Sequence, residues 1–239
     1  MQAKRRSEPK TSKAVPASDV RTMFDRIAPD YDRFNSWASL GMHQRWRKEL
    51  IRRIPVSCRV LDLATGTGDV AFLAAEAGHS VVGLDFSDAM LEKAKAKDER
   101  RQIRWMNGSA AKLPFSDRSF GAIVSAFVLR NIRGTLDAAF RENFRVLRNG
   151  GVVLHMDFGR PESSWARWGH RLHLKVGVPL VGQWICGERW PKQYLENTIE
   201  SFYAPSDIKD RLTQAGFRQV THHDLLWGAV RIYEGVKPL

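Results

Sequence analysis

A short stretch of the chain, residues 60–69, places two glycines directly after an apolar run that contains one acid. Gly66 and Gly68 flank Thr67, and because they lack a Cβ atom a bulky ligand can lie against the main chain of the turn. Asp85 ends the next apolar run, at the spacing from the glycines where nucleotide folds place a carboxylate on ribose hydroxyls. These residues predict a site for a ligand that carries a ribose.

The acid inside the first apolar run, Asp62, separates two kinds of ligand. The glycines followed by Ala71 also fit the relaxed dinucleotide fingerprint. A dinucleotide, however, brings a pyrophosphate, which helix amides stabilise and a nearby acid does not. An acid in an apolar strand is costly unless it is paired, and S-adenosylmethionine brings ammonium and sulfonium cations. The stretch therefore favours S-adenosylmethionine, and hence methyl transfer, with a nicotinamide oxidoreductase or a purely structural capping role for Asp62 as alternatives.

Three further segments follow predicted strands, at the edge where open α/β sheets bind ligands. The loop 107–115 offers polar groups for an adenine edge, or simply plugs into the core. Arg130 and Asn131 end an apolar run and are expected to face the crevice, although Asn131 also suits a helix cap. The segment 157–159 is a candidate wall for the pocket of the methyl acceptor.

The elements that must position these residues alternate between the period of a strand and the period of a helix. We predict strands 58–63, 80–85, 102–106, 120–126, 151–157, 217–223 and 226–235, with helices 69–77, 87–97, 134–148 and 206–215. This order is typical of an α/β fold with a mostly parallel seven-stranded sheet and one antiparallel strand near the end, the Rossmann-like class I arrangement of S-adenosylmethionine-dependent methyltransferases. Apolar residues at helical spacing in 23–27 and 46–51 predict an N-terminal helical lid.

Composition limits the domain organisation and the partners. With 239 residues and 43% hydrophobic content the chain can form one domain, expected over 19–239 after a disordered basic tail at 1–18. The net charge of +12 suits nucleic acid or anionic lipid equally. No catalytic nucleic-acid methyltransferase motif is evident and the basic residues are dispersed, so no nucleic-acid partner is expected.

Cysteine usage and hydropathy indicate the compartment. Cys58 and Cys186 form neither a disulfide framework nor a metal-ligand spacing, so we expect packed thiols and no metal. No apolar run approaches the roughly 18 residues of a membrane span. The expected location is the cytoplasm, with at most a peripheral membrane contact.

Several segments from residue 20 onward resemble one family, the ubiquinone/menaquinone biosynthesis C-methyltransferases. The resemblance rests on Phe24-Asp25-Arg26-Ile27-Ala28-Pro29-Asp30-Tyr31-Asp32, Gly41-Met42-His43, Trp46-Arg47, Leu129-Arg130-Asn131 and Ala215-Gly216-Phe217. It implies methylation of a ring carbon on a prenylated benzoquinol or naphthoquinol, with S-adenosylmethionine as donor. Which ring is methylated, the length of the tail and the oligomeric state are left open.

Twelve residues are the expected contacts of the methyl donor: Tyr31, Asp62, Thr65, Gly66, Thr67, Gly68, Asp85, Phe86, Ser109, Ala110, Ser125 and Ala126. The resemblance places Thr67, Asp85, Ser109 and Ala110 at cofactor positions, and Tyr31 is expected to close over the cofactor. Two positions depart from the family pattern: Ser109 replaces an Asp or Asn, and Ala126 replaces a serine. Ser125 points to the other strand face and would not simply replace that serine. These departures keep open a noncatalytic cofactor-binding partner in a quinone-synthesis complex.

The resemblance also assigns the chemistry. An acceptor carbon needs electron density, which a quinol gains when its neighbouring hydroxyl loses a proton. Arg130 and Asn131 are the candidates for holding that oxygen, with the charge of Arg130 stabilising the phenolate. A water polarised by Arg130, or His43, is the candidate base, although His43 also suits a structural role.

The segment 162–187 looks least like a methyltransferase. Trp165, Trp168 and Leu172 recur at helical spacing, with Arg171 and Lys175 on other faces. Tryptophan beside basic residues suits a membrane interface, and an ordinary helix packed on the sheet is the alternative.

Overall fold

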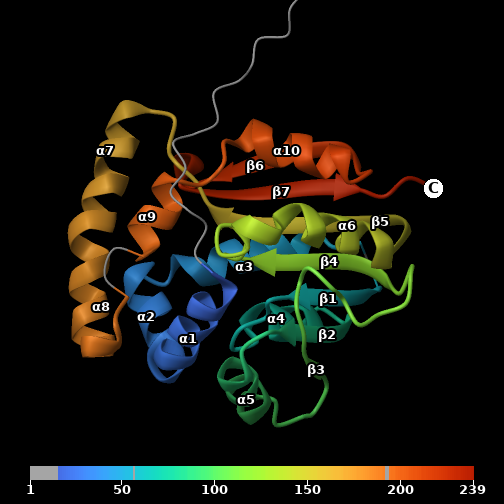
Figure 1. Ribbon diagram of the computed structural model, residues 1–239, viewed down its shortest axis with the longest axis horizontal. Coiled ribbons are helices and arrows are strands. Elements are labelled where there is room, and N and C mark those ends of the chain that lie inside the picture. The colour runs from blue at the N-terminus through green and yellow to red at the C-terminus, as the bar shows by residue number, and fades with distance from the viewer. Residues whose placement is uncertain (1–15, 56, 192–193) are drawn as a thin grey trace, which may run out of the picture.

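The computed structural model describes residues 16–55, 57–191 and 194–239, and its centre is a seven-stranded sheet (Figure 1). The strands are β1 (Arg59–Leu63), β2 (Ser80–Asp85), β3 (Arg104–Asn107), β4 (Phe120–Ala126), β5 (Leu147–Phe158), β6 (Arg218–Leu225) and β7 (Val230–Val236). Their order is β3-β2-β1-β4-β5-β7-β6, with β7 antiparallel to both neighbours and the other pairs parallel. The predicted Rossmann-like sheet is confirmed.

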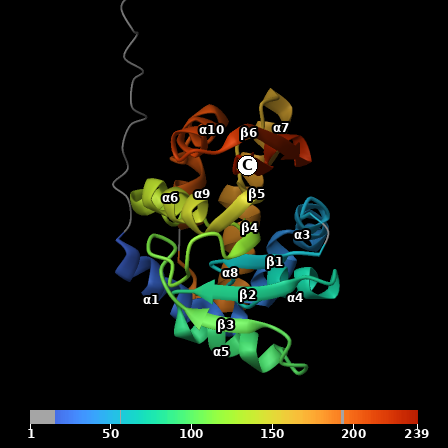
Figure 2. The same cartoon turned by 90° about the vertical axis from the view of Figure 1, so that its right-hand side faces the viewer.

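Helices cover both faces of this sheet (Figure 2). On one face lie α3 (Met42–Arg52) and α4 (Asp69–Glu76), which pack Leu50 and Val70 against β1 and β4. On the other lie α6 (Leu136–Val146) and α10 (Pro205–Gln214), which contribute Phe140 and Leu212 to a second core. The helix after β2, α5 (Asp88–Lys97), begins as expected at Ser87, whose hydroxyl accepts a hydrogen bond from the Met90 amide at 3.1 Å.

The remaining helices gather beyond the carboxyl ends of the parallel strands, at the left of Figure 1. They are α1 (Ala17–Ile27), α2 (Tyr31–Ala38), α7 (Ser164–Leu172), α8 (Val178–Cys186) and α9 (Tyr194–Glu200), with a π-helical turn at His173–Gly177 joining α7 to α8. Short 3-10 turns occupy Ala28–Asp30, Arg133–Thr135, Gly187–Arg189 and Leu226–Gly228. The predicted lid is therefore present as α1, α2 and α3, above the point between β1 and β4 where the strand order reverses.

Some predicted boundaries were wrong, for local backbone reasons. The last strand begins at Val230 rather than 226, because Leu226 and Trp227 adopt left-handed angles within a 3-10 turn. Strand β5 begins at Leu147, which pairs with Phe120 ahead of a register shift, so helix α6 ends at Val146 instead of 148.

The sequence also made predictions for the N-terminal tail, the two cysteines and membrane spans. Residues 1–15 of the predicted tail lie outside the described residues, and α1 begins at Ala17, inside the range 1–18. Cys58 and Cys186 are free and buried, as predicted. Among the described residues, no helix combines the length and the apolar character needed to cross a bilayer.

Candidate functional site

The glycine turn after β1 is a tight loop with left-handed backbone. Ala64, Gly66 and Gly68 have φ angles of 54°, 57° and 89°. A Cβ atom on Gly68 would lie 2.6 Å from the Trp105 ring, whereas one on Gly66 would meet its nearest neighbour, Tyr31, at 4.0 Å. Gly68 is thus required by packing as well as by its φ angle, and the Gly66 side of the turn stays open toward the lid.

Asp85 fastens this turn to the end of β2. Its two carboxylate oxygens accept hydrogen bonds from the Gly66 amide at 2.8 Å and from the Ser87 amide at 2.9 Å. Burial raises the pKa of Asp85 to about 6, against the lowering effect of these amides. Each oxygen keeps a second lone pair, so the carboxylate can hold the turn and still accept bonds from ribose hydroxyls.

Asp62 lies at the end of β1 and is 1% exposed. The Thr65 hydroxyl donates to it at 2.6 Å, and burial raises the pKa of this carboxyl to about 7. A buried acid of this kind is stabilised by a nearby cation. The pair of acids, Asp62 and Asp85, therefore fits the cationic amino acid part and the ribose of S-adenosylmethionine.

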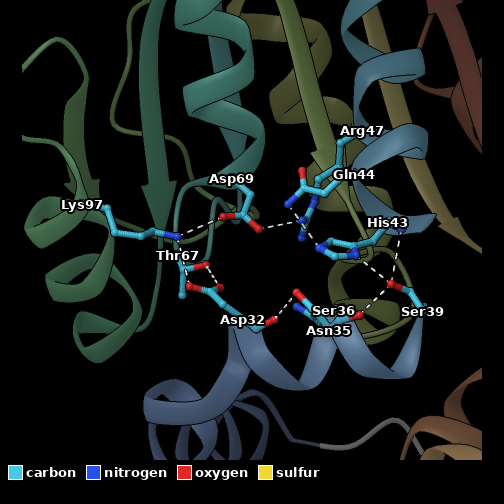
Figure 3. A network of polar contacts seen from close by, with 10 residues as sticks. All are labelled: Asp32, Asn35, Ser36, Ser39, His43, Gln44, Arg47, Thr67, Asp69 and Lys97. Atoms are coloured by element: carbon cyan, nitrogen blue, oxygen red, sulfur yellow. Dashed lines mark hydrogen bonds and ion pairs between the residues drawn. The ribbon is translucent and has the colours of Figure 1, made fainter. Parts of the chain in front are cut away.

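The lid is tied to the glycine turn by the polar network of Figure 3. The Thr67 hydroxyl donates to Asp32 of α2 at 2.5 Å, and Lys97 of α5 donates to Asp32 at 3.1 Å and to Asp69 at 3.0 Å. The other oxygen of Asp69 pairs with Arg47 of α3 at 2.6 Å. Two lid helices are thereby joined to the start of α4 and the end of α5.

An apolar cavity lies between the lid, the ends of β4 and β5, and helices α7 to α9. The described side chains that line it include Phe24, Tyr31, Trp46, Arg47, His43, Phe127, Arg130, Phe158, Leu174, Val178 and Tyr194. Phe127 and Phe158 stack with ring centroids 4.5 Å apart and form one wall. The segment 157–159 thus contributes Phe158 to the wall of this cavity, and its role as a wall for the methyl acceptor stays a prediction.

Arg130 is held at the wall of this cavity by a buried ion pair. Its Nη1 lies 2.5 Å from Asp157, which is fully buried, and its guanidinium lies over the Phe158 ring at 5.0 Å from the centroid. The Nε atom of Arg130 is buried without a hydrogen-bond partner among the described residues. The cation is fixed in position at the cavity wall, and one of its donors is unpaired.

Asn131, the residue after Arg130, contacts the side chain of Tyr194. Its amide nitrogen donates to the Phe127 carbonyl at 3.2 Å, and its oxygen accepts from the Tyr194 hydroxyl at 3.0 Å. Tyr194 lines the cavity, and burial raises the pKa of its phenol. Asn131 therefore positions Tyr194, a residue for which the sequence pattern gave no signal.

His43 lines the same cavity and is buried within α3. Because the Gln44 amide nitrogen lies 3.2 Å from Nε2, that nitrogen is the acceptor, and Nδ1–H donates to Ser39 Oγ at 2.7 Å. Burial, and then the charge of Arg47, lower the pKa of His43. The imidazole is neutral, with its basic nitrogen on the side of the exposed Gln44.

Of the other predicted contacts of the methyl donor, Phe86, Ser109, Ala110 and Ala126 follow or end strands, whereas Ser125 lies within β4. The Ser109 hydroxyl is exposed and accepts from the Ala111 amide at 3.3 Å, beside the half-buried Ala110 and near Phe86, whose carbonyl accepts from Asn107. Ala126 lies at the end of β4 on the α3–α4 face. Ser125 does not join this group: it is fully buried and bonded to His155 at 2.8 Å on the opposite face. This packing gives no support to the predicted contact between Ser125 and the methyl donor.

Three functional contacts were missed by sequence reasoning. Asp157 was noted only as part of a wall, although an acid ending an apolar strand is the signal that a buried cation lies nearby. Asp32 and Asp69, which lie 37 residues apart, are bridged by Lys97, and no local pattern relates them. Tyr194 belongs to a helix whose place over the cavity depends on tertiary packing.

The comparisons with known proteins agree with this geometry. The family model described as the ubiE/COQ5 methyltransferase family matches residues 10–237. The demethylmenaquinone methyltransferase of Protochlamydia amoebophila is 33% identical over 92% of this chain and 95% of its own, and the ubiquinone/menaquinone biosynthesis C-methyltransferase of Syntrophotalea carbinolica is 35% identical over 94% and 96%.

Solved structures share the fold at low identity. The [4+2]-cyclase SpnF superposes with a TM-score of 0.70 at 17% identity, over 98% of this chain and all of that one. Such a likeness concerns the fold alone. The family match, which spans nearly the whole chain, carries more: this protein belongs to the ubiE/COQ5 methyltransferase family and is an S-adenosylmethionine-dependent methyltransferase.

Proposed function

We propose that this protein methylates a ring carbon of a prenylated quinol, with demethylmenaquinol as the first acceptor to test. The observation that carries the proposal is a mostly apolar cavity, next to the donor turn, whose wall holds the fixed cation Arg130 beside Tyr194. An aromatic ring with an oxygen substituent and a hydrocarbon tail matches that lining. The relatives named for demethylmenaquinone support a naphthoquinol acceptor, and those named for ubiquinone keep the benzoquinol as a second acceptor.

Activation of the acceptor falls to Arg130 and its neighbours. When bound, S-adenosylmethionine supplies an electrophilic methyl group on a sulfonium. The guanidinium of Arg130 lies beside the ring oxygen and stabilises the negative charge that forms as the hydroxyl proton leaves. Asp157 keeps the guanidinium in place, and Tyr194, whose hydroxyl proton is donated to Asn131, presents the lone pairs of its hydroxyl oxygen at the cavity wall.

The proton of the ring hydroxyl needs an acceptor, and His43 is the proposed base. It is neutral, lines the cavity, and accepts at Nε2 once the exposed Gln44 side chain moves aside. Methyl transfer to the ring carbon would form the C–C bond as the methyl–sulfur bond of the donor breaks, leaving S-adenosylhomocysteine. The hydrogen of that ring carbon would leave as a proton to solvent, which restores the aromatic ring, and His43 would return its proton to the ring oxygen.

Closure of the lid excludes water from this reaction. Tyr31 lies over the glycine turn and on the cavity lining, and burial raises the pKa of its phenol. Dry surroundings strengthen the interaction of Arg130 with a developing phenolate. Tyr31 thus joins the donor and acceptor sides under one cover.

The function is tested by mass spectrometry of the products formed with a methyl-labelled donor. The acceptors are short-chain demethylmenaquinol, the corresponding demethylated benzoquinol, and each ring in its oxidised form. We expect one labelled methyl group on carbon in the reduced naphthoquinol and none in either quinone, because an oxidised ring lacks the electron density to attack. Retained donor binding without turnover on both quinols would instead identify a noncatalytic cofactor-binding protein.

We further propose a peripheral membrane contact through the outer side of α7 and α8. Exposed apolar side chains form one stripe along these helices: Trp165, Trp168, Leu172, Val176, Leu180 and Trp184. The exposed rings of Trp227 and Trp37 contact the two ends of this stripe, at Trp165 and Trp184, and belong to the same surface. We call these residues the tryptophan face. The inner side of the same helix presents Leu174 and Val178 to the acceptor cavity. One helix therefore separates the cavity from the tryptophan face.

The chemistry of the tryptophan face supports a bilayer surface as its partner. Exposed Arg171 and Lys175 lie beside the apolar stripe, and tryptophan with basic residues is the composition favoured at lipid headgroups. The double variant Trp165→Ala/Trp168→Ala should weaken sedimentation with vesicles that contain phosphatidylglycerol while donor affinity stays unchanged. Equal vesicle binding by the variant would refute the contact, and a shift from dimer to monomer without loss of vesicle binding would assign the face to self-association.

A further inference from the structure

Arg47 has one unused buried donor. Its side chain is 6% exposed, and one end nitrogen, Nη1, is paired with Asp69. The Nε atom is buried and has no hydrogen-bond partner among the described residues. A buried donor without an acceptor is costly, so a ligand that brings an acceptor to this guanidinium would stabilise it.

The surroundings place this donor at the methyl-donor turn. Asp69, which holds Arg47, is the first residue of α4 and follows Gly68 directly (Figure 3). Arg47 also lines the cavity next to Tyr31, the residue that covers Gly66. Its charge acts on the carboxyl of Asp62, whose pKa it lowers against the larger effect of burial. The guanidinium therefore stands between the lid and the end of β1.

The methyl donor also carries a negative charge, which needs a cationic partner near the turn. Asp62 and Asp85 suit the cationic and hydroxyl parts of S-adenosylmethionine, but the methionine end of that molecule also carries a carboxylate. Arg47, Lys97 and Arg130 are cations near the crevice in the part of the chain that the structure describes. Lys97 is shared by Asp32 and Asp69 and is partly exposed, and Arg130 is committed to Asp157 at the ends of β4 and β5. Arg47 is the cation that is both buried and beside the turn.

We propose that the guanidinium of Arg47 binds the α-carboxylate of the donor's methionine moiety. Because α3 belongs to the lid, the donor then links the lid directly to the first strand of the sheet, in addition to the contacts through Asp69. This assignment depends on the use of S-adenosylmethionine and not on the identity of the acceptor.

Isothermal calorimetry with three ligands tests it without any turnover. S-adenosylhomocysteine has the carboxylate, decarboxylated S-adenosylmethionine lacks it and keeps the ammonium, and methylthioadenosine lacks both. Arg47→Met should weaken S-adenosylhomocysteine by roughly 10- to 100-fold, the size of one charge-assisted hydrogen bond. The affinities for the other two ligands should stay within about two-fold, because neither carries a carboxylate.

Two further variants separate binding from support of the fold. Lys97→Met removes a comparable ion pair to Asp69 but leaves Arg47 in the cavity, so it should change the three affinities little and equally. Arg47→Met/Asp69→Asn removes the acid that the single substitution strands, and should keep the selective loss. An equal loss for all three ligands in both Arg47 variants would show that Arg47 only supports the lid, and an unchanged affinity for S-adenosylhomocysteine would place the carboxylate elsewhere.

Discussion

The donor side and the acceptor side of this site are built in different ways. The donor side is a nearly continuous piece of chain, from Asp62 to Ser87, in which a strand end, two glycines and one carboxylate fix the backbone of a turn. The acceptor side collects Tyr31, Arg130 and Tyr194 from three separate segments. The first is defined by main-chain geometry and the second by packing, so the acceptor can change without disturbing the donor turn.

The largest expected effect is on kcat, and it comes from replacing Arg130, which should affect the acceptor side and leave the donor side unchanged. Arg130→Ala should lower kcat by about 10²–10³-fold, because it removes a donor aimed at developing charge, and should leave donor affinity within about two-fold. Arg133→Ala is the matched control, since Arg133 lies three residues along and contacts the Tyr203 ring. Steady-state kinetics and calorimetry supply the two measurements. A parallel loss of donor affinity would show that the sides are coupled through Arg130.

The glycine turn responds to a different kind of change. Gly68→Ala combines a left-handed residue, which costs about 1–2 kcal/mol, with a clash against Trp105, for which overpacking costs about 1–3 kcal/mol. Gly66→Ala carries the first cost alone, because its nearest neighbour is 4.0 Å away. Denaturant unfolding without ligand should therefore rank Gly68→Ala as the less stable variant. Equal midpoints would mean that Trp105 moves aside freely.

The sequence predicted the donor side more completely than the acceptor side. The strand pattern, the cap at Ser87, the antiparallel strand and the donor turn were predicted because each depends on residues close together in the chain. The ion pair of Arg130 with Asp157, the place of Tyr194 and the lid network depend on which distant segments pack together. Ser125 illustrates a related difficulty: alternation along β4 turns its side chain to His155, and a motif position alone does not tell which face a residue occupies.

The donor side also makes a prediction about pH through Asp62. The pKa of this carboxyl rises to about 7 in the folded protein from an ordinary 3.8, so between these values the folded state binds more protons than the unfolded state. The free energy of unfolding of the ligand-free protein then falls as pH rises through this window. Asp62→Asn removes the effect, and should gain about 2 kcal/mol relative to the parent between pH 5.5 and 7.5.

The control for this pH effect is Asp69, whose pKa shifts the other way. Burial raises the pKa of Asp69, but Arg47 and Lys97 outweigh burial and lower it. Asp69→Asn should therefore be destabilising near neutral pH, with a penalty that shrinks as the parent is acidified through the ordinary range of a carboxyl. Thermal melts across pH distinguish the two acids, and the same Asp62→Asn variant should bind S-adenosylmethionine more weakly. A pH-independent gap between parent and Asp62→Asn would contradict a raised pKa.

The smallest effect on the site is expected at Ser125, and it tests the boundary between site and core. Ser125, His155 and Asn143 form a fully buried chain, in which His155 faces Ser125 at 2.8 Å and Asn143 at 3.1 Å. Burial lowers the pKa of His155 to about 3, so the ring is neutral and Ser125 completes its hydrogen bonds. Ser125→Ala should cost about 1–3 kcal/mol of stability by leaving a buried donor unpaired.

That cost should not reach the methyl donor, because the chain lies on the α6 face of β4 while the crevice opens above the end of the strand. Calorimetry with S-adenosylhomocysteine should give a dissociation constant within about two-fold of the parent, at a temperature well below the melt. Ala126→Ser, one residue along and on the opposite face, is the matched test. A larger change in the dissociation constant for Ser125→Ala than for Ala126→Ser would mean that β4 presents its other face to the donor. The donor side would then include residues that are here assigned to the packed core.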